Sequence, residues 1–143
     1  FTVAVRYDAD DRALNGAFLA TGSRLAGWAF AVEDGVPLVI HNASSSRNDR
    51  FEIRAEEPLE ANHGEVRFTF VPDDAQLLSP GTMQIYVGDR LIASGRIERV
   101  SFLTMGPGET MDIGDDTGRR VMDYPAGPEF SGLIEEVIIS KGN

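Results

Sequence analysis

The chain has 143 residues, 42% of them hydrophobic and 25% charged, with a net charge of −10 and no cysteine. This length suits one domain, and the lack of cysteine excludes a disulfide framework, a thiolate metal site and a cysteine nucleophile. Binding to nucleic acid or to a membrane is not expected, because the thirteen Lys and Arg residues form no cluster beyond Arg119-Arg120 and no apolar run approaches the ~20 residues of a membrane span.

Alternating hydrophobic residues predict β-strands in the first part of the chain. The alternation begins at once, over 1–10, and the lack of an initiator methionine suggests a fragment or a processed product. Residues 27–34 and 36–42 alternate on either side of Asp34-Gly35, a dipeptide typical of tight hairpins. The run 42–49 that follows is rich in Ser and Asn, which predicts a mobile polar loop.

The same pattern continues to the end of the chain. Strands are expected within 50–56, 65–73, 82–100 and 129–140, with a turn at Gly88-Asp89. No window shows the apolar stripe of a helix, and Gly and Pro recur at strand-length intervals.

About ten short strands therefore predict an all-β fold, an antiparallel jelly-roll β-sandwich formed by a single domain over 1–143. Since both faces of each sheet are not expected to be apolar, one face of each strand should line the core between the sheets. The residues predicted to line it are Trp28, Phe30, Val32, Val66, Phe68, Phe70, Met83, Ile85 and Val87.

The triplet Asp116-Thr117-Gly118 matches the one that carries the catalytic aspartate of aspartic proteases. In such a site two carboxylates share one proton in an apolar setting. Here Asp115 precedes the triplet and Arg119-Arg120 follows it, so added charges would keep the acids ionised. We therefore interpret the stretch as a strand end at 109–114 followed by a polar turn, with the arginines pairing with Asp115 and Asp116.

The same stretch is rich in oxygen ligands that suit calcium. An EF-hand is excluded, because Gly114 and Thr117 stand at positions of its template that require a ligand and a glycine. Two alternatives stay open, a calcium site of another kind and a solvated acidic loop, and we favour the loop. The four candidate calcium ligands are Asp112, Asp115, Asp116 and Asp123.

Two further groups are weighed as catalytic or metal sites. Glu52 and Glu56 share a strand face, as the acid pair of a sandwich glycosidase would, but Arg54 stands between them where a third acid is expected. A charged outer strand face explains all three residues. His41 and His63 have no metal-ligand spacing around them, and both are expected at the surface or in turns.

Four stretches together resemble the carboxy-terminal region of long bacterial arylsulfatases. They are GAFLATGSRLAGWAFAVEDGVPLVIHN, GTMQIYVGDRLIASGRIER, GETMDIGDDTGRRVMDY and EFSGLIEEVIIS, in this order. In that family a formylglycine-dependent hydrolase core precedes a sandwich that is similar to concanavalin A or laminin G domains. The residues that match the loop of the family are Gly114, Asp116, Thr117, Gly118, Val121 and Tyr124.

The resemblance implies a carboxy-terminal accessory domain without catalysis, since the chain contains no Cys/Ser-x-Pro-x-Arg run. Its implied partners are the sulfatase catalytic domain of a longer parent chain or a second copy, in the bacterial cytoplasm or periplasm. It implies no cofactor beyond the calcium considered above. The alternative is a lectin-like carbohydrate-binding module, which would display exposed aromatic rings. The residues expected to contact a ligand or partner are Asp115, Asp116, Thr117, Arg119, Arg120 and Tyr124.

Overall fold

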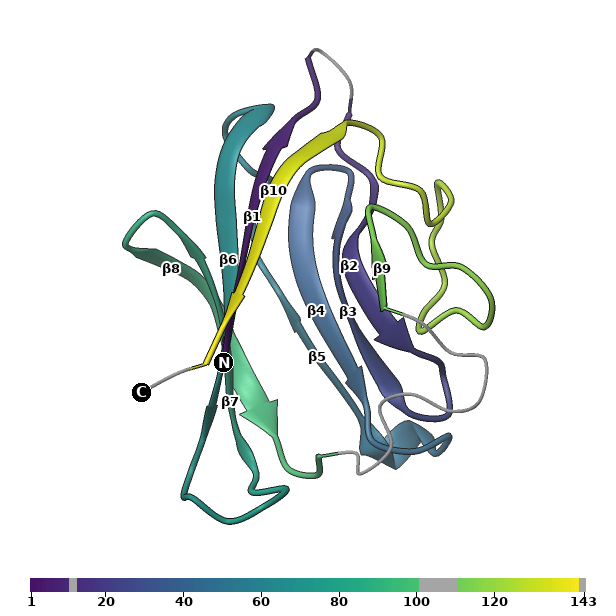
Figure 1. Ribbon diagram of the computed structural model, residues 1–143, viewed down its shortest axis with the longest axis vertical. Coiled ribbons are helices and arrows are strands. Elements are labelled where there is room, and N and C mark those ends of the chain that lie inside the picture. The colour runs from purple at the N-terminus through teal and green to yellow at the C-terminus, as the bar shows by residue number, and fades with distance from the viewer. Residues whose placement is uncertain (11–12, 101–110, 142–143) are drawn as a thin grey trace.

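The computed structural model describes residues 1–10, 13–100 and 111–141, and it shows two five-stranded antiparallel sheets packed face to face (Figure 1). The first sheet has the order β10 (Leu133–Ser140), β1 (Thr2–Asp8), β6 (His63–Pro72), β7 (Gly81–Val87) and β8 (Arg90–Ile97). The second sheet has the order β5 (Arg50–Arg54), β4 (Val36–Asn42), β3 (Gly27–Glu33), β2 (Gly16–Gly22) and β9 (Met111–Ile113). These ten strands confirm the predicted all-β antiparallel sandwich.

Helical structure in the described residues is limited to the 3-10 turn η1 (Arg47–Asp49), within the run that was expected to be a polar loop. None of these residues forms a helix with the length and hydropathy that a membrane crossing requires.

Both predicted hairpins are present. Strands β3 and β4 pair through Glu33 and Val36, and Asp34 (φ 47°) and Gly35 (φ 81°) between them both have left-handed backbone angles. This combination gives the type I′ turn whose twist matches that of paired strands. Strands β7 and β8 pair through Val87 and Arg90, across Gly88-Asp89.

Of the nine residues predicted to line the core between the sheets, six are buried there and three are not. The six that are buried are Phe30, Val32, Val66, Phe68, Met83 and Ile85. Trp28, Phe70 and Val87 are only partly buried and pack against the margin of the core. At this margin the Trp28 ring packs against two other rings. Its centroid lies 5.8 Å from that of Phe1 and 5.7 Å from that of Phe68.

The second sheet has a second apolar layer on its outer face, so the expectation that one face of each sheet would be polar is wrong here. Alanines of β2 and β3 give this face small side chains, which let another segment approach the sheet closely. That segment is 114–132, which we call the covering segment and which lies beside β2 and β9 in Figure 1. The buried residues of this layer are Ala17, Ala20, Ala29, Ala31, Leu38, Ile40, Val121, Met122 and Tyr124.

Candidate functional site

The stretch that carries the Asp-Thr-Gly triplet begins as the sequence predicts. Strand β9 ends at Ile113, and the chain then bends at Gly114 (φ 74°) and Gly118 (φ 66°), two positive angles that glycine adopts without strain. From residue 111 on, the interpretation as a strand end followed by a shaped loop is therefore confirmed, while residues 109 and 110 of the expected strand end lie outside the described residues.

Asp116 is the buried centre of this loop. Its side chain is 3% exposed, and one carboxylate oxygen, Oδ2, accepts hydrogen bonds from the backbone N–H of Val121 (2.9 Å) and the hydroxyl of Tyr124 (2.6 Å). Burial raises the pKa of the Asp116 carboxyl above its usual value, while these two hydrogen bonds oppose the rise. The carboxylate faces its own loop and holds Val121 and Tyr124 on the second sheet.

The expected ion pairs between the two arginines and the loop aspartates are absent from the described residues. Arg119 and Arg120 are exposed, whereas Asp116 points inward and Asp115 accepts a hydrogen bond from the backbone N–H of Asp116 at 2.7 Å. The loop is thus held by hydrogen bonds among its own residues, from backbone N–H groups and the Tyr124 hydroxyl to the two aspartates. Of the six residues expected to contact a ligand or partner, Thr117, Arg119 and Arg120 are exposed, Asp115 is half-buried, and Asp116 and Tyr124 are buried.

The four candidate calcium ligands each have a separate interaction. Asp112 accepts hydrogen bonds from the backbone and hydroxyl of Thr117, both at 2.8 Å, and Asp123 forms an ion pair with Arg24. In the part of the chain that the structure describes, no three His, Asp or Glu side chains are grouped to hold a metal ion. The preference for a loop without calcium stays a prediction and is taken up in the Discussion.

Of the two glutamates compared with a glycosidase pair, Glu52 lies on β5 beside Arg54, as interpreted, whereas Glu56 follows the end of this strand, so the two do not share one strand face. Arg54 forms ion pairs of 2.9 Å with both Glu52 and Glu33. His63 is exposed, but the expectation for His41 is wrong, because it lies on β4 with 5% of its surface exposed. Burial lowers the pKa of His41 to about 4, so its imidazole is neutral near pH 7.

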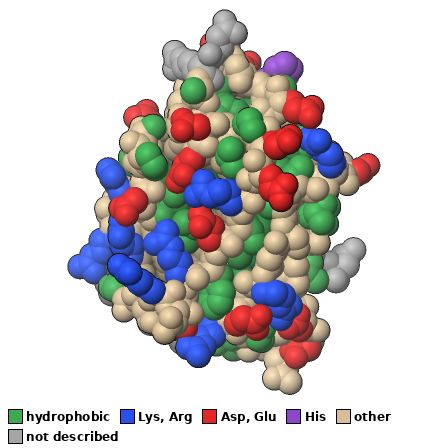
Figure 2. All heavy atoms as spheres, turned by 180° about the vertical axis from the view of Figure 1, so that it is seen from behind, with side chains coloured by type: hydrophobic (Ala, Val, Ile, Leu, Met, Phe, Trp, Pro, Cys, Tyr) green, Lys and Arg blue, Asp and Glu red, His purple; other side chains and the backbone are tan. Residues whose placement is uncertain are grey.

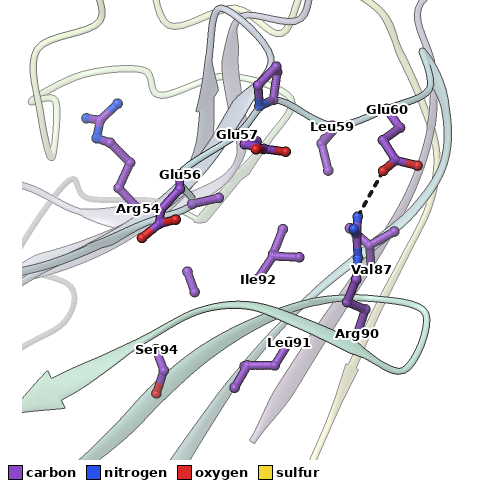
Figure 3. Close-up of a pocket in the computed structure, with 13 residues that line it drawn as sticks. Arg54, Glu56, Glu57, Leu59, Glu60, Val87, Arg90, Leu91, Ile92 and Ser94 are labelled. Atoms are coloured by element: carbon purple, nitrogen blue, oxygen red, sulfur yellow. Dashed lines mark ion pairs between the residues drawn. The ribbon is translucent and has the colours of Figure 1, made fainter.

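A groove of about 460 Å³ lies between the last strands of the two sheets, β5 and β8 (Figure 3). Glu56, Glu57 and Leu59 line one wall, while β8 with Arg90 lines the other. Arg90 forms an ion pair with Glu60 at 3.5 Å, drawn as the dashed line. The groove lining contains no aromatic ring, and its arginines already have carboxylate partners, so it suits an anionic or sugar-like ligand poorly.

A more suitable surface is the outer side of the first sheet, which we call the open face. In Figure 1 no described segment lies outside this sheet, in contrast to the second sheet. The strand register aligns four hydrogen-bonding side chains in one row across it, Thr2, Thr69, Gln84 and Ser94. The adjacent row continues from Ala4 on β1 to Arg67 on β6 and Tyr86 on β7.

These two rows surround a shallow hollow of about 360 Å³. The guanidinium carbon of Arg67 lies 4.9 Å from the centre of the Tyr86 ring, and its Nη2 donates to the carbonyl of Gly88 at 3.3 Å. The Tyr86 hydroxyl donates to Gln84 at 3.1 Å. The hollow is lined by Phe1, Thr2, Arg67, Thr69, Phe70, Val71, Gln84 and Tyr86.

Two polar groups of this hollow are incompletely satisfied within the described residues. Arg67 forms no ion pair with a carboxylate there, and Thr69 Oγ1 is buried without a hydrogen-bond partner. A guanidinium, an aromatic ring, an amide and hydroxyls together can hold a polar ligand that carries an anionic group. Sequence reasoning missed this set, because Arg67 and Tyr86 resemble ordinary solvent-facing strand residues until strand pairing makes them neighbours.

Comparisons with known proteins support the fold and give no family. No protein-family model and no curated protein matches the chain. Among solved structures it is similar to the CBM40 module of the IT-sialidase of Ruminococcus gnavus, with 14% identity and a TM-score of 0.62 over 96% of this chain and 73% of that one.

The same module matches in two complexes. One is bound to α2,3 sialyllactose, with 13% identity and a TM-score of 0.58 over 95% of this chain and 72% of that one. The other is bound to α2,6 sialyllactose, with 13% identity and a TM-score of 0.61 over 95% and 73%. These matches confirm the lectin-like jelly-roll sandwich. They give no support to the arylsulfatase resemblance.

Proposed function

We propose that this chain is a non-catalytic carbohydrate-binding module that holds an acidic sugar on the open face of the first sheet. The proposal depends chiefly on Arg67, which lies against Tyr86 beside a row of hydroxyl and amide side chains and has no carboxylate partner among the described residues. The similarity to modules solved with sialyllactose supports a sugar with a carboxylate, such as sialic acid.

In this proposal each group has a separate task. The planar guanidinium of Arg67, oriented by the Tyr86 ring and the Gly88 carbonyl, donates paired N–H groups to the sugar carboxylate. Gln84 and Thr2 of the neighbouring row bind sugar hydroxyls. Val71 at one end of the hollow, which is about half exposed, contacts apolar parts of the sugar. None of these groups breaks a bond, so the module binds without catalysis.

The second candidate is the accessory role implied by the arylsulfatase resemblance. It is favoured by exposed apolar side chains on the edge strands β9 and β10, a surface that another domain or a second copy would cover. These side chains are Met111, Ile113, Leu133, Ile138 and Ile139.

Titration calorimetry with α2,3 sialyllactose and with lactose tests the main proposal. We expect sialyllactose to bind at least about tenfold more tightly than lactose, and Arg67→Ala to weaken its binding by at least about tenfold, because the carboxylate loses its charged donor. Arg6→Ala is the matched control, since Arg6 is a solvent-exposed arginine of the same sheet that pairs with Glu136.

The control should change the affinity by less than about twofold. Equal binding of lactose and sialyllactose, or sialyllactose binding that Arg67→Ala leaves unchanged, would contradict the proposed site. Failure to bind either sugar, together with stable association of the chain with a sulfatase hydrolase domain, would favour the accessory role instead.

A further inference from the structure

A second polar hollow lies at one end of the second sheet, away from the open face. It has a volume of about 520 Å³ and is formed by the turn between β2 and β3, the end of β4, the segment 43–50 and one residue of the covering segment. We call it the arginine hollow, and it is lined by Arg24, Asn42, Ser44, Ser45, Ser46, Arg47, Arg50 and Asp123.

The charge of this hollow is opposite to that of the whole chain, which is −10. Three arginines line it against one aspartate, and that aspartate, Asp123, pairs with Arg24. Figure 2 shows Lys and Arg side chains gathered along one side of the molecule, the side that carries the β2–β3 turn and the segment 43–50 in Figure 1.

Two of the guanidinium groups are available to a ligand. Arg47 and Arg50 are exposed and form no ion pair within the described residues. The nearby carboxylate of Asp49 is already bound by Arg99 at 2.7 Å and by the hydroxyl of Ser44 at 2.6 Å. Arg47 and Arg50 therefore carry the positive charge of the hollow that no carboxylate neutralises. An anion in solvent can reach both side chains, because both are exposed.

The backbone that carries these arginines is held in place by buried and local hydrogen bonds. Asn42 is 3% exposed, and its Nδ2 donates to the carbonyls of Ser23 (3.3 Å) and Val121 (2.8 Å), which joins β4 to the β2–β3 turn and the covering segment. Ser46 caps η1 by accepting from the backbone N–H of Asn48 at 3.3 Å. A fixed backbone lowers the entropy that binding a ligand must overcome.

We infer that the arginine hollow is a second binding site, which takes an oxyanion group of a polyanionic saccharide. Arginine donors on a fixed framework suit sulfate esters and carboxylates, both of which accept paired N–H groups. The choice of a saccharide as the carrier rests on the proposed function. A nucleic acid would require a much larger basic surface than three arginines on an acidic chain.

The test uses three hexasaccharide probes with the whole chain, namely chondroitin sulfate, hyaluronan and neutral chitin. Affinities are measured by calorimetry at about 50 mM salt, where screening is weak. We expect the sulfated probe to bind and the chitin probe not to bind. The double variant Arg47→Ala/Arg50→Ala should weaken binding of the sulfated probe by at least about tenfold.

The double variant Arg119→Ala/Arg120→Ala is the matched control, because it removes the same charge from two exposed arginines of the covering segment that do not line the hollow. It should change the affinity by less than about threefold. Hyaluronan that binds as tightly as chondroitin sulfate supports a carboxylate as the recognised group, and weaker hyaluronan binding supports the sulfate ester.

Two results would overturn the inference. The first is binding of neither acidic probe at low salt, and the second is a loss of affinity in the Arg119/Arg120 variant as large as that in the Arg47/Arg50 variant. Arg67→Ala separates the two sites, since it should weaken sialyllactose binding by at least about tenfold and leave binding of the chondroitin sulfate probe unchanged. If the chain binds the sulfated probe but not sialyllactose, the open-face proposal fails while the arginine hollow stands.

Discussion

Asp116 belongs to an Asp-Thr-Gly triplet like that of aspartic proteases, but here its side chain stabilises the loop that contains it. A protease aspartate is placed to share a proton with a second carboxylate. Asp116 instead accepts from Val121 and Tyr124 on a single oxygen, and the enclosed Tyr124 hydroxyl has a raised pKa because of burial and the adjacent carboxylate. Neither group is placed for proton exchange with a substrate, and their contact fixes the covering segment.

Replacing this aspartate should destabilise the fold. Asp116→Ala removes the acceptor of two buried donors, which should lower the free energy of unfolding by about 2–4 kcal/mol. Asp116→Asn keeps an oxygen at the same place and should lower it by about 1–2 kcal/mol. Urea denaturation measures both values. Asp115→Ala is the control and should cost less than about 1 kcal/mol, because among the described residues Asp115 bonds only the next backbone N–H. Equal losses at the two positions would show that the buried contact does not stabilise the loop.

At the scale of elements, the covering segment gives the second sheet a different environment from the first. Its residues Val121, Met122 and Tyr124 pack on alanines of β2 and β3, so both faces of these strands are buried. The outer face of the first sheet instead remains open to solvent. One sheet is therefore enclosed on both faces, whereas the other leaves the side chains of its outer face accessible.

The acidic loop of the covering segment should not depend on calcium. We expect melting curves in millimolar calcium and in chelator to agree within about two degrees, because Asp112, Asp116 and Asp123 already bind donors within the protein. Calorimetry or fluorescence melting measures the difference. A rise of several degrees that is lost in Asp115→Ala or in Asp116→Asn would assign a metal ion to this loop.

At the scale of the whole molecule, the acidic surface and one buried histidine should decide how stability depends on pH. His41 lines a small apolar cavity beside Trp28 and Phe68, and its folded pKa of about 4 lies below the 6.5 of an exposed imidazole. Between these values the unfolded chain binds a proton at this residue and the folded chain does not. Its contribution to stability is therefore present above pH 6.5 and decreases as the pH falls toward 4.

The loss due to His41 should amount to about 3 kcal/mol over this range. Denaturant unfolding of the wild-type chain and of His41→Phe at several pH values measures it, because the carboxylates are common to both chains and cancel in the difference. The wild-type chain should lose more stability on acidification than the variant, whatever the stability of the variant near neutral pH. Parallel curves would show that folding does not lower the pKa of His41.

The sequence alone determined the features that depend on neighbouring residues. Alternation of apolar and polar residues indicated strands, because successive side chains of a strand point to opposite faces. Asp34-Gly35 indicated its hairpin, because its residues tolerate the positive backbone angles of the turn. The bend after β9 also followed from the glycines at 114 and 118, but not the burial of Asp116, since a local pattern does not reveal what a loop packs against.

Only the tertiary structure decided which residues form sites. Arg67 and Tyr86 become neighbours through the pairing of β6 with β7, and Arg24, Arg47 and Arg50 meet because the β2–β3 turn and the segment after β4 lie at one end of the sheet. The outer alanines of β3 looked like the solvent side of a strand until the covering segment packed on them. The physical reason is the same in each case: strand order and register join residues far apart in the chain, and alternation specifies the face of a side chain but not its lateral neighbours.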